Sequence, residues 1–231
     1  LLRQIPRGRV TTYGDLAEAL GDLAAARWVA QELNLLRDDA TGDLPWHRVI
    51  RRTGELASGS ADVQERQRRR LADDGVAVND DGRIAASLRW SELKSNRPLS
   101  GLADWQESAA AMARRNVPML VPEIVGGVDL SYASPTEAVA AYAAVDVSTR
   151  QVVAQRVIRA AVGFPYISGY LTFRELPPLL ELLSAVRAAN ELAPVVLVDG
   201  SGCLHPRRFG IAVSVGLLGN CTTIGVSKHK L

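Results

Sequence analysis

The sequence predicts two domains, an α-rich domain that contains a helix-turn-helix and an α/β domain built on a mixed sheet. Its 231 residues exceed the usual size of one domain, and a hydrophobic content of 47% is enough for two cores. Short helical patterns dominate the first half, whereas long β-branched and Ala/Val runs occupy the second. The polar stretch Lys94–Gly101 predicts a linker between them. We therefore expect domains at residues 1–95 and 96–231.

The first two helices of the chain predict the helix-turn-helix. The segment Thr12–Asp15 leads into the run Leu16–Leu20, and Gly21 is a typical C-terminal stop. A second helix is predicted over Ala24–Asn34, where apolar residues recur at helical spacing. DNA-binding domains use two short helices joined by a tight turn in this way. Many protein cores contain such a pair too, so the pattern alone leaves a purely structural role open.

A third helix and a hairpin complete the first domain. Residues Asp62–Asp74 have the spacing of a helix. Asn79–Gly82 has the composition of a hairpin turn and separates the short stretches Val76–Val78 and Arg83–Ala85. We expect these two stretches to pair as the small β element of the domain.

The second domain alternates helices and strands. After an amphipathic helix over Leu102–Asn116, three strands joined by short connections indicate an antiparallel meander. The alternation of helices and apolar strands that follows indicates parallel pairing, so the sheet is mixed and has helices packed on it. The elements predicted after the first helix are strands Ile124–Leu130, Ala138–Asp146 and Gln151–Ile158, helix Phe173–Asn190, strand Val195–Val198, helix Phe209–Leu218 and strand Thr223–Val226.

The chain is nearly neutral overall. Its 27 Lys and Arg against 25 Asp and Glu give a formal charge of +2, which excludes a polybasic tail and a disordered polyelectrolyte. Any nucleic-acid surface is therefore a local patch. Almost all of the cations are arginine, whose planar guanidinium suits phosphates and base edges. A genome biased toward Arg codons explains the same excess equally well.

The cysteines and the absence of export signals bear on the cellular location, and the two ends of the sequence bear on its completeness. Cys203 and Cys221 are too few for a disulfide framework. The chain shows no signal-peptide pattern and no apolar stretch of about 18 residues, so we expect a cytoplasmic monomer with no membrane partner. The sequence starts at Leu1 inside an apparent helix and stops at Leu231 after a strand-like run. We expect both ends to be truncated.

Three carboxylates of the second domain stand out by their positions. Asp129 lies inside an otherwise apolar strand, Glu175 opens a helix and Asp199 ends a strand. A charge within a buried strand is costly unless it is paired or bound to metal, and open α/β sheets place their sites at the carboxyl ends of strands. The three together offer the hard oxygen ligands of Mg²⁺ or Mn²⁺ in phosphodiester hydrolysis. The alternative is that each pairs with a local arginine such as Arg174 or Arg207.

The motifs around these carboxylates resemble endonuclease V in order and spacing. The resemblance implies a ribonuclease H-like fold, cleavage of the phosphodiester 3′ to a deaminated purine, chiefly inosine, and a requirement for Mg²⁺, which Mn²⁺ can replace. Ser168 stands where the family's strand-separating loop usually has proline, and Ser214 where a histidine is common. The matching segments are Gly127–Tyr132, Phe164–Leu171, Phe173–Pro177, Val198–Gly202, His205–Gly210 and Thr223–Lys228.

The same resemblance implies roles for single residues. Tyr166 would lie in the wedge that separates the DNA strands, and the loop Gly200–Gly210 would help to form the pocket for the displaced base. The residues implied to be catalytic are Asp129, Glu175, Asp199 and Lys228, the three carboxylates being the implied metal ligands. The residues implied to line the base pocket are Gly200, Gly202 and His205. His205 also has an ordinary interpretation, in which a histidine before proline caps the turn.

Motifs in the first half resemble the DNA-binding domain of O6-alkylguanine-DNA alkyltransferase, a winged helix-turn-helix. The Pro-Cys-His-Arg-Val motif of the active enzymes is present with Trp46 in the position of the cysteine, which is the mark of the alkyltransferase-like proteins. An indole cannot accept an alkyl group as a thiolate does, so direct alkyl transfer is excluded. The matching segments are Ile5–Ala17, Ala26–Val29, Leu44–Ile50, Gly54–Gly59 and Gln67–Val76.

This second resemblance implies three DNA-binding residues. Arg27 would be the finger inserted where a nucleotide leaves the stack, Tyr13 would rotate the flanking phosphate, and Trp46 would line the pocket for the flipped base. Without the family, Trp46 is most simply a core aromatic, and the arginines within Arg66–Arg70 form a solvated helix face.

The leading hypothesis is a two-domain DNA-repair protein. A non-catalytic module that recognises O6-alkylguanine-type lesions by base flipping is fused to a Mg²⁺-dependent endonuclease that acts on deaminated purines. Both modules extract a base, at a cost of roughly a few kcal/mol that damage lowers. Double-stranded DNA with alkylated or deaminated bases is the expected partner, and RNA is an alternative. A second hypothesis is a lesion sensor whose nuclease half is degenerate. A winged-helix transcription regulator is disfavoured because it leaves the nuclease motifs unexplained.

Overall fold

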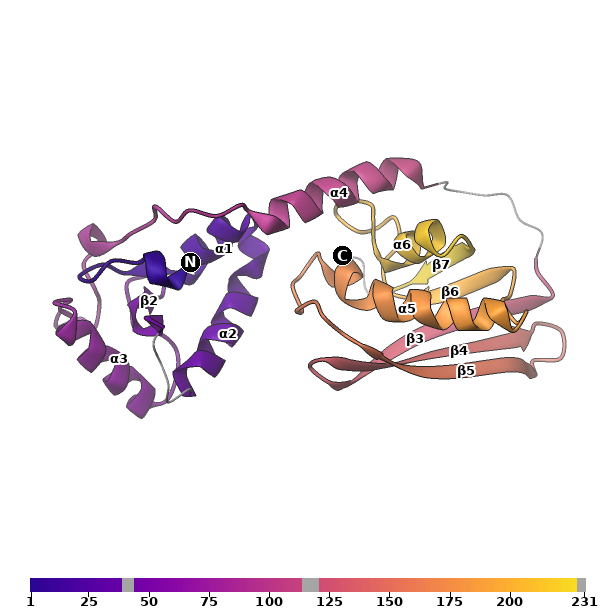
Figure 1. Ribbon diagram of the computed structural model, residues 1–231, viewed down its shortest axis with the longest axis horizontal. Coiled ribbons are helices and arrows are strands. Elements are labelled where there is room, and N and C mark those ends of the chain that lie inside the picture. The colour runs from indigo at the N-terminus through magenta and orange to yellow at the C-terminus, as the bar shows by residue number, and fades with distance from the viewer. Residues whose placement is uncertain (39–43, 114–120, 228–231) are drawn as a thin grey trace. The chain divides into compact units, whose positions relative to one another are not determined.

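The computed structural model of the chain describes residues 1–38, 44–113 and 121–227. The chain folds as two compact units, Leu1–Leu102 and Ala103–Leu231 (Figure 1). This division falls a few residues beyond the boundary expected from the sequence and lies within helix α4, Pro98–Met112. Within the described ranges, no helix combines the length and the apolar character that crossing a membrane requires.

The first unit places helices around a short parallel ladder. Strand β1, Thr11–Thr12, pairs with β2, Val49–Ile50, so that Thr11 lies opposite Val49. The α-helices are α1, Tyr13–Leu20, α2, Ala26–Asp38, and α3, Ala61–Asp73. Four short 3₁₀ helices complete the described part of this unit, namely η1, Leu2–Gln4, η2, Leu23–Ala25, η3, Trp46–Arg48, and η4, Ala86–Leu88.

Local sequence determines where α1 begins and ends. The Thr12 hydroxyl accepts a hydrogen bond from Asp15 N–H at 3.1 Å, and the Asp15 carboxylate accepts one from Thr12 N–H at 3.0 Å, which is a capping box. Gly21 ends the helix with φ of 106°, a conformation that favours glycine. A Cβ at Gly21 would also lie 2.7 Å from Ser100 N. The predicted pair of helices with a glycine turn between them is therefore present.

The hairpin predicted at residues 76–85 is wrong. Its turn forms, since Gly82 N–H donates to Asn79 O at 2.9 Å, but the flanking stretches are not strands. Arg83 instead forms an antiparallel bridge with Glu55, and Ile84 N–H donates to Gly54 O at 2.9 Å. The chain after the turn thus pairs with a distant segment, which the composition of the turn does not reveal.

The second unit contains a mixed sheet whose strand order is β5-β4-β3-β6-β7 in the described part of the chain. The first three strands in sequence form the predicted antiparallel meander, and β6 and β7 join it in parallel. The elements are β3, Ile124–Ser134, β4, Glu137–Asp146, β5, Val152–Ala161, α5, Leu171–Ala188, β6, Val195–Asp199, α6, Ile211–Leu218, and β7, Thr222–Val226.

Helices α5 and α6 cover one face of this sheet (Figure 1). Val128 of β3 and Val198 of β6 are buried against these helices in the main core of the unit. Because side chains alternate along a strand, the next residues, Asp129 and Asp199, point to the opposite face, where both are exposed. The expectation that Asp129 is a buried charge is therefore wrong, since only one face of the strand is apolar and covered.

Candidate functional site

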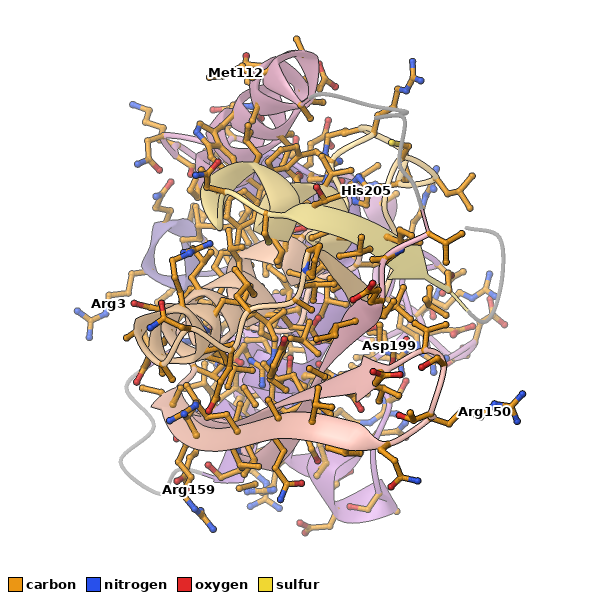
Figure 2. The ribbon with its side chains drawn as sticks, turned by 90° about the vertical axis from the view of Figure 1, so that its right-hand side faces the viewer. Arg3, Met112, Arg150, Arg159, Asp199 and His205 are labelled. Carbon is orange, nitrogen blue, oxygen red and sulfur yellow. The ribbon has the colours of Figure 1, made fainter. Side chains whose placement is uncertain are left out.

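Two carboxylates project from adjacent parallel strands of the second unit. Val128 lies opposite Val198 in the register of β3 and β6, so Asp129 and Asp199 follow at the same level on neighbouring strands, which are typically about 4.8 Å apart. Both are exposed on the sheet face that α5 and α6 leave uncovered (Asp199 is labelled in Figure 2). The topology brings together two residues that are far apart in sequence.

Glu175, near the start of α5, belongs to the same electrostatic group. Burial raises the pKa of Glu175, and the carboxylates of Asp199 and Asp129 raise it further, against the Tyr132 hydrogen bond and the Arg174 charge. The Tyr132 hydroxyl donates to Glu175 Oε1 at 3.1 Å. Burial and the Glu175 carboxylate raise the pKa of Tyr132 to about 12. Mutual repulsion thus links the three carboxylates predicted from the sequence.

The arginines considered as partners of these carboxylates hold backbone carbonyls instead. Arg174 donates to Phe164 O. Arg207 donates to Gly169 O and, at 2.8 Å, to Gln106 Oε1. The ion pairs found among the described residues include none of the three carboxylates. These hydrogen bonds of Arg174 and Arg207 go to loop and amide oxygens, and the Arg174 charge offsets only part of what raises the pKa of Glu175.

The donor set of the group suits a divalent cation. Three carboxylates supply the hard oxygen atoms that Mg²⁺ and Mn²⁺ prefer, and a cation among them would relieve the repulsion that raises the pKa of Glu175. As the side chains lie, no three His, Cys, Asp or Glu residues of the described ranges are arranged so that they could hold a metal ion. Binding would therefore require side chains of the group to turn toward a common point.

Tyr166 lies in the loop between β5 and α5 and is 59% exposed. Ile167 and Tyr170 of the same loop are almost completely buried. The loop is therefore anchored by its apolar residues and presents the Tyr166 ring to solvent. Ser168, which replaces the proline usual in the family, is exposed as well.

The loop after β6 contains three glycines. Its conformation requires a glycine at positions 200 and 210 but not at position 202. Gly200 has φ of 138°, and a Cβ there would lie 2.4 Å from Ile211 Cγ2. A Cβ at Gly210 would lie 2.2 Å from Ser201 O. At Gly202, by contrast, a Cβ would meet its neighbours at 3.9 Å, an ordinary contact. Close packing of the loop on α6 explains Gly200 and Gly210, but not Gly202.

His205 connects the loop after β6 to the Tyr166 loop. Its Nδ1 accepts from Arg207 N–H at 3.2 Å, so the ring proton lies on Nε2, which is 3.2 Å from Gly169 O. Burial and the Arg207 charge lower the pKa of His205 and favour the neutral ring. The side chain therefore both caps its own turn and donates across to the neighbouring loop (His205 is labelled in Figure 2).

Two further positions bear on the resemblance to the nuclease family. Lys228 lies outside the described residues. Ser214, which stands in place of a common histidine, is fully buried in α6 and donates to Gly210 O at 2.8 Å. In this chain, position 214 therefore faces the core.

In the first unit, Trp46 is a buried aromatic flanked by cations. It is only 3% exposed and packs in a core with Val29 and Leu33. The guanidinium carbons of Arg37 and Arg70 lie 5.6 and 5.7 Å from the ring centroid, within the range of a cation–π contact. In this conformation Trp46 is a core aromatic, as the interpretation without the family predicts.

Tyr13 shares Arg37 with Trp46, whereas Arg27 lies apart. Arg37 Nη2 donates to the Tyr13 hydroxyl at 2.6 Å, and Nη1 donates to Ser58 O at 2.9 Å. Burial raises the pKa of Tyr13, against the Arg37 charge. Arg27 is exposed in the first turn of α2 and forms none of the ion pairs found among the described residues. The structure therefore brings Tyr13 and Trp46 together and leaves Arg27 available to solvent.

Two residues around Trp46 escaped the sequence analysis. Gln67 is fully buried, accepts from Ala57 N–H at 2.9 Å, and donates to His47 O at 3.0 Å and to Val49 O at 2.9 Å. Its position four residues before Leu71, at core spacing, was the available signal. The second residue is Asp74, which binds several cations and has no comparable signal in sequence.

The helical first unit and the mixed sheet that carries the carboxylates each match a known protein family. A profile of Endonuclease V matches residues 106–231, and one of the 6-O-methylguanine DNA methyltransferase DNA-binding domain matches residues 1–76. The chain therefore belongs to the endonuclease V family, in the bifunctional form that carries an alkyltransferase-like DNA-binding domain. It is a DNA-repair fusion whose second domain is of the nuclease type.

The individual relatives agree with this assignment. The bifunctional methyltransferase/endonuclease of Picrophilus torridus is 36% identical over the whole of this chain and 73% of its own length. The endonuclease V of Streptomyces coelicolor is 43% identical over 46% of this chain and 44% of its own. The structure of Ciona intestinalis endonuclease V with a DNA containing an inosine followed by a ribo-adenosine is similar with a TM-score of 0.55 and 29% identity. The chain covers 60% of that protein, with 59% of its own length matched.

Proposed function

We propose that the second domain cleaves the phosphodiester 3′ to deaminated purines, chiefly inosine, in double-stranded DNA, and that the first domain recognises O6-alkylguanine-type lesions without removing the alkyl group. The observation that carries the nuclease proposal is the parallel register that places Asp129 beside Asp199, with Glu175 coupled to both. The relative whose structure contains an inosine DNA supports the choice of substrate.

The residues of the second domain have distinct tasks in this reaction. Asp129, Glu175 and Asp199 would hold Mg²⁺ or Mn²⁺, which supplies Lewis-acid polarisation of the phosphate and activation of the attacking water. Tyr132 donates to Glu175 Oε1 and so fixes one oxygen of that carboxylate. Lys228 is proposed to contact the phosphate.

The two loops of the domain would handle the DNA strands and the base. The exposed Tyr166 ring is available to stack between separated strands. The displaced base would meet the loop that contains His205, Gly200 and Gly202. At Gly202 a Cβ would make only ordinary contacts, and a glycine that packing does not require suits close approach of a ligand.

In the first domain, the proposed function is binding by base flipping. Trp46 offers no nucleophile, so a captured O6-alkylguanine would leave unchanged. Arg27 is free to enter the stack from α2, and Tyr13 would contact the flanking phosphate. Because Trp46 is buried under Arg37 and Arg70, capture of a base requires these cations to move aside.

The nuclease proposal is tested with a deoxyinosine duplex, with and without Mg²⁺ and a chelator. Asp129→Asn and Asp199→Asn should each lower the nicking rate by at least about a hundredfold, because each removes a charged ligand oxygen and keeps the side-chain shape. Glu181→Gln, an exposed change on the same helix as Glu175, is the matched control and should be neutral. Metal-independent nicking, or full activity of Asp199→Asn, would contradict the assignment. Binding without any nicking would favour the lesion-sensor alternative.

The lesion-binding proposal is tested by comparing the affinity of the chain for two DNA duplexes, one of which contains a lesion. At one fixed salt concentration, since phosphate contacts depend on salt, the chain should bind a duplex with O6-methylguanine more tightly than the unmodified duplex. The guanine recovered afterwards should still carry its methyl group. Equal affinity for both duplexes, or recovery of demethylated guanine, would refute this part.

A further inference from the structure

The loop that carries Tyr166 is held at both ends through backbone carbonyls. At its start, Arg174 Nη1 donates to Phe164 O. At its end, His205 Nε2 and Arg207 Nη2 both donate to Gly169 O. Two arginines from different elements therefore fix the ends of the loop and leave the exposed Tyr166 between them.

Arg174 also contacts the carboxylate group through an aromatic ring. Its guanidinium lies 4.3 Å from the centroid of the Tyr132 ring, a cation–π contact. The hydroxyl of the same tyrosine donates to Glu175 Oε1 at 3.1 Å. An unbroken series of contacts thus runs from the carbonyl of Phe164, through Arg174 and Tyr132, to Glu175.

The contacts of Arg174 require the planar, forked guanidinium group that only arginine has among the cationic side chains. One nitrogen of the fork reaches Phe164 O, the other reaches Pro135 O at 3.1 Å, and the guanidinium stacks on Tyr132. A lysine ammonium is a compact charge that cannot bridge two carbonyls and stack at the same time. The Tyr132 ring and its hydroxyl are likewise separable, because phenylalanine keeps the ring contact and loses the donor.

We propose that Arg174 is a positioning residue that couples the Tyr166 loop to the carboxylate Glu175, with Tyr132 as the intermediate. Insertion of the loop into DNA and the arrangement of the carboxylate group are then one event. The proposal rests on the proposed function, because it assigns Tyr166 to strand separation and Glu175 to the cation. The proposal adds a route by which binding of DNA to the Tyr166 loop would orient Glu175 through Arg174 and Tyr132.

The coupling is tested by hydrogen exchange of the loop, residues 164–170, in the whole chain without DNA. In the absence of metal, Arg174→Lys should speed exchange of this loop by about tenfold, since it loses hydrogen bonds from a charged donor. Tyr132→Phe should speed exchange by a smaller factor, since it keeps the ring contact with Arg174 but loses the hydrogen bond to Glu175. The control is Arg159→Lys on β5, an exposed arginine that projects from the sheet and pairs with Glu137 (Figure 2).

Addition of Mn²⁺ separates coupling from simple anchoring of the loop. In the unmodified chain, Mn²⁺ should slow exchange of the loop, because it fixes Glu175 and through it Tyr132 and Arg174. Arg174→Lys should bind Mn²⁺, as measured by calorimetry, within about twofold of the unmodified chain but lose the response of the loop. Tyr132→Phe should bind Mn²⁺ several-fold more weakly and also lose the response. Equal slowing in all variants, or unchanged loop exchange in metal-free Arg174→Lys, would overturn the coupling.

Failure of the proposed function can be told apart from failure of the coupling. If the unmodified chain binds no Mn²⁺, the metal assignment fails, and the coupling is judged on Glu175→Gln without metal. That change weakens the acceptor of Tyr132, so it should alter loop exchange when Arg174 is present and have no effect in the Arg174→Lys background. Equal effects in both backgrounds would refute the coupling.

Discussion

Each unit of the chain contains a carboxylate in a crowded polar setting, and the two settings are opposite in charge. Asp74 accepts hydrogen bonds from Arg7, His47 and Arg48 at 3.0, 2.9 and 2.6 Å. Burial opposes the shift, but the hydrogen bonds from Arg48 and His47 lower the pKa of Asp74 to about 2. Burial, and after it the charges of Asp199 and Asp129, raise the pKa of Glu175. A carboxylate saturated with cations belongs to the scaffold, whereas one placed among like charges is suited to a cation from solution.

The largest expected difference between the two units comes from the same change, aspartate to asparagine, made once in each unit. Asp74→Asn leaves the largely buried Arg48 and His47 without a charged acceptor and should destabilise the first unit by about 3 kcal/mol. Asp199→Asn, on the exposed face, should change the stability of the second unit by less than about 0.5 kcal/mol. Urea unfolding measures both, with tryptophan fluorescence for the first unit, which contains Trp28, Trp46 and Trp90. Similar losses for both variants would contradict the distinction.

Gln67 tests whether the segment of Trp46 is rigidly held. Gln67→Leu should destabilise the first unit by about 2 kcal/mol, because a buried N–H and two buried carbonyls lose their partner. Gln64→Leu, an exposed glutamine on the same helix, is the control and should lie within about 0.5 kcal/mol of the unmodified chain. Equal unfolding midpoints in urea for the two variants would show that the buried hydrogen bonds of Gln67 contribute little.

Arg27 tests the first unit as a DNA reader. Arg27→Ala should weaken binding to an O6-methylguanine duplex by about tenfold and binding to plain duplex much less, because an inserted side chain fills the gap left by a displaced base. Arg68→Ala, on the exposed face of α3, should not discriminate between the two duplexes. Titrations at one salt concentration measure the difference. A uniform loss on both duplexes would reassign Arg27 to the DNA backbone.

The smallest expected effect is on the acid side of the stability profile. Because the pKa of Asp74 is lower in the folded chain than its usual 3.8, the carboxylate contributes stability above that pH and loses it as the pH falls toward about 2. The free energy of unfolding of the first unit, followed by fluorescence, should therefore fall between about pH 4 and about pH 2, and Asp74→Asn should flatten this part of the profile. An unchanged slope in the variant would show that other groups dominate.

Local signals in the sequence predicted much of the fold. The stop of the first helix at Gly21 and the meander of β3, β4 and β5 depend on neighbours in sequence and were predicted. The parallel pairing of β6 with β3 follows the expected alternation of strand and helix, and its register places Asp129 and Asp199 at the same level on neighbouring strands. Their roles in catalysis stay predictions.

What the sequence did not predict depends on contacts between distant segments. The pairing of Arg83 with Glu55 replaced a local hairpin. The exposure of Asp129 depends on helices that cover only one face of the sheet. Arg174 was considered as a partner for a carboxylate, yet it bridges carbonyls of two loops. In each case the decisive partner is chosen by tertiary packing, which residue type and spacing do not encode.

The parallel junction between β3 and β6 has a consequence for how the second unit is assembled. Strands β3, β4 and β5 join neighbours in sequence, so their ladder can close early, whereas β6 reaches β3 only after α5 is in place. Contacts between residues far apart in sequence form slowly because a long loop must close first. We therefore expect Asp129 and Asp199 to meet late in folding, after the meander that contains Asp129 has formed. The acidic pair is thus a marker of the completed sheet.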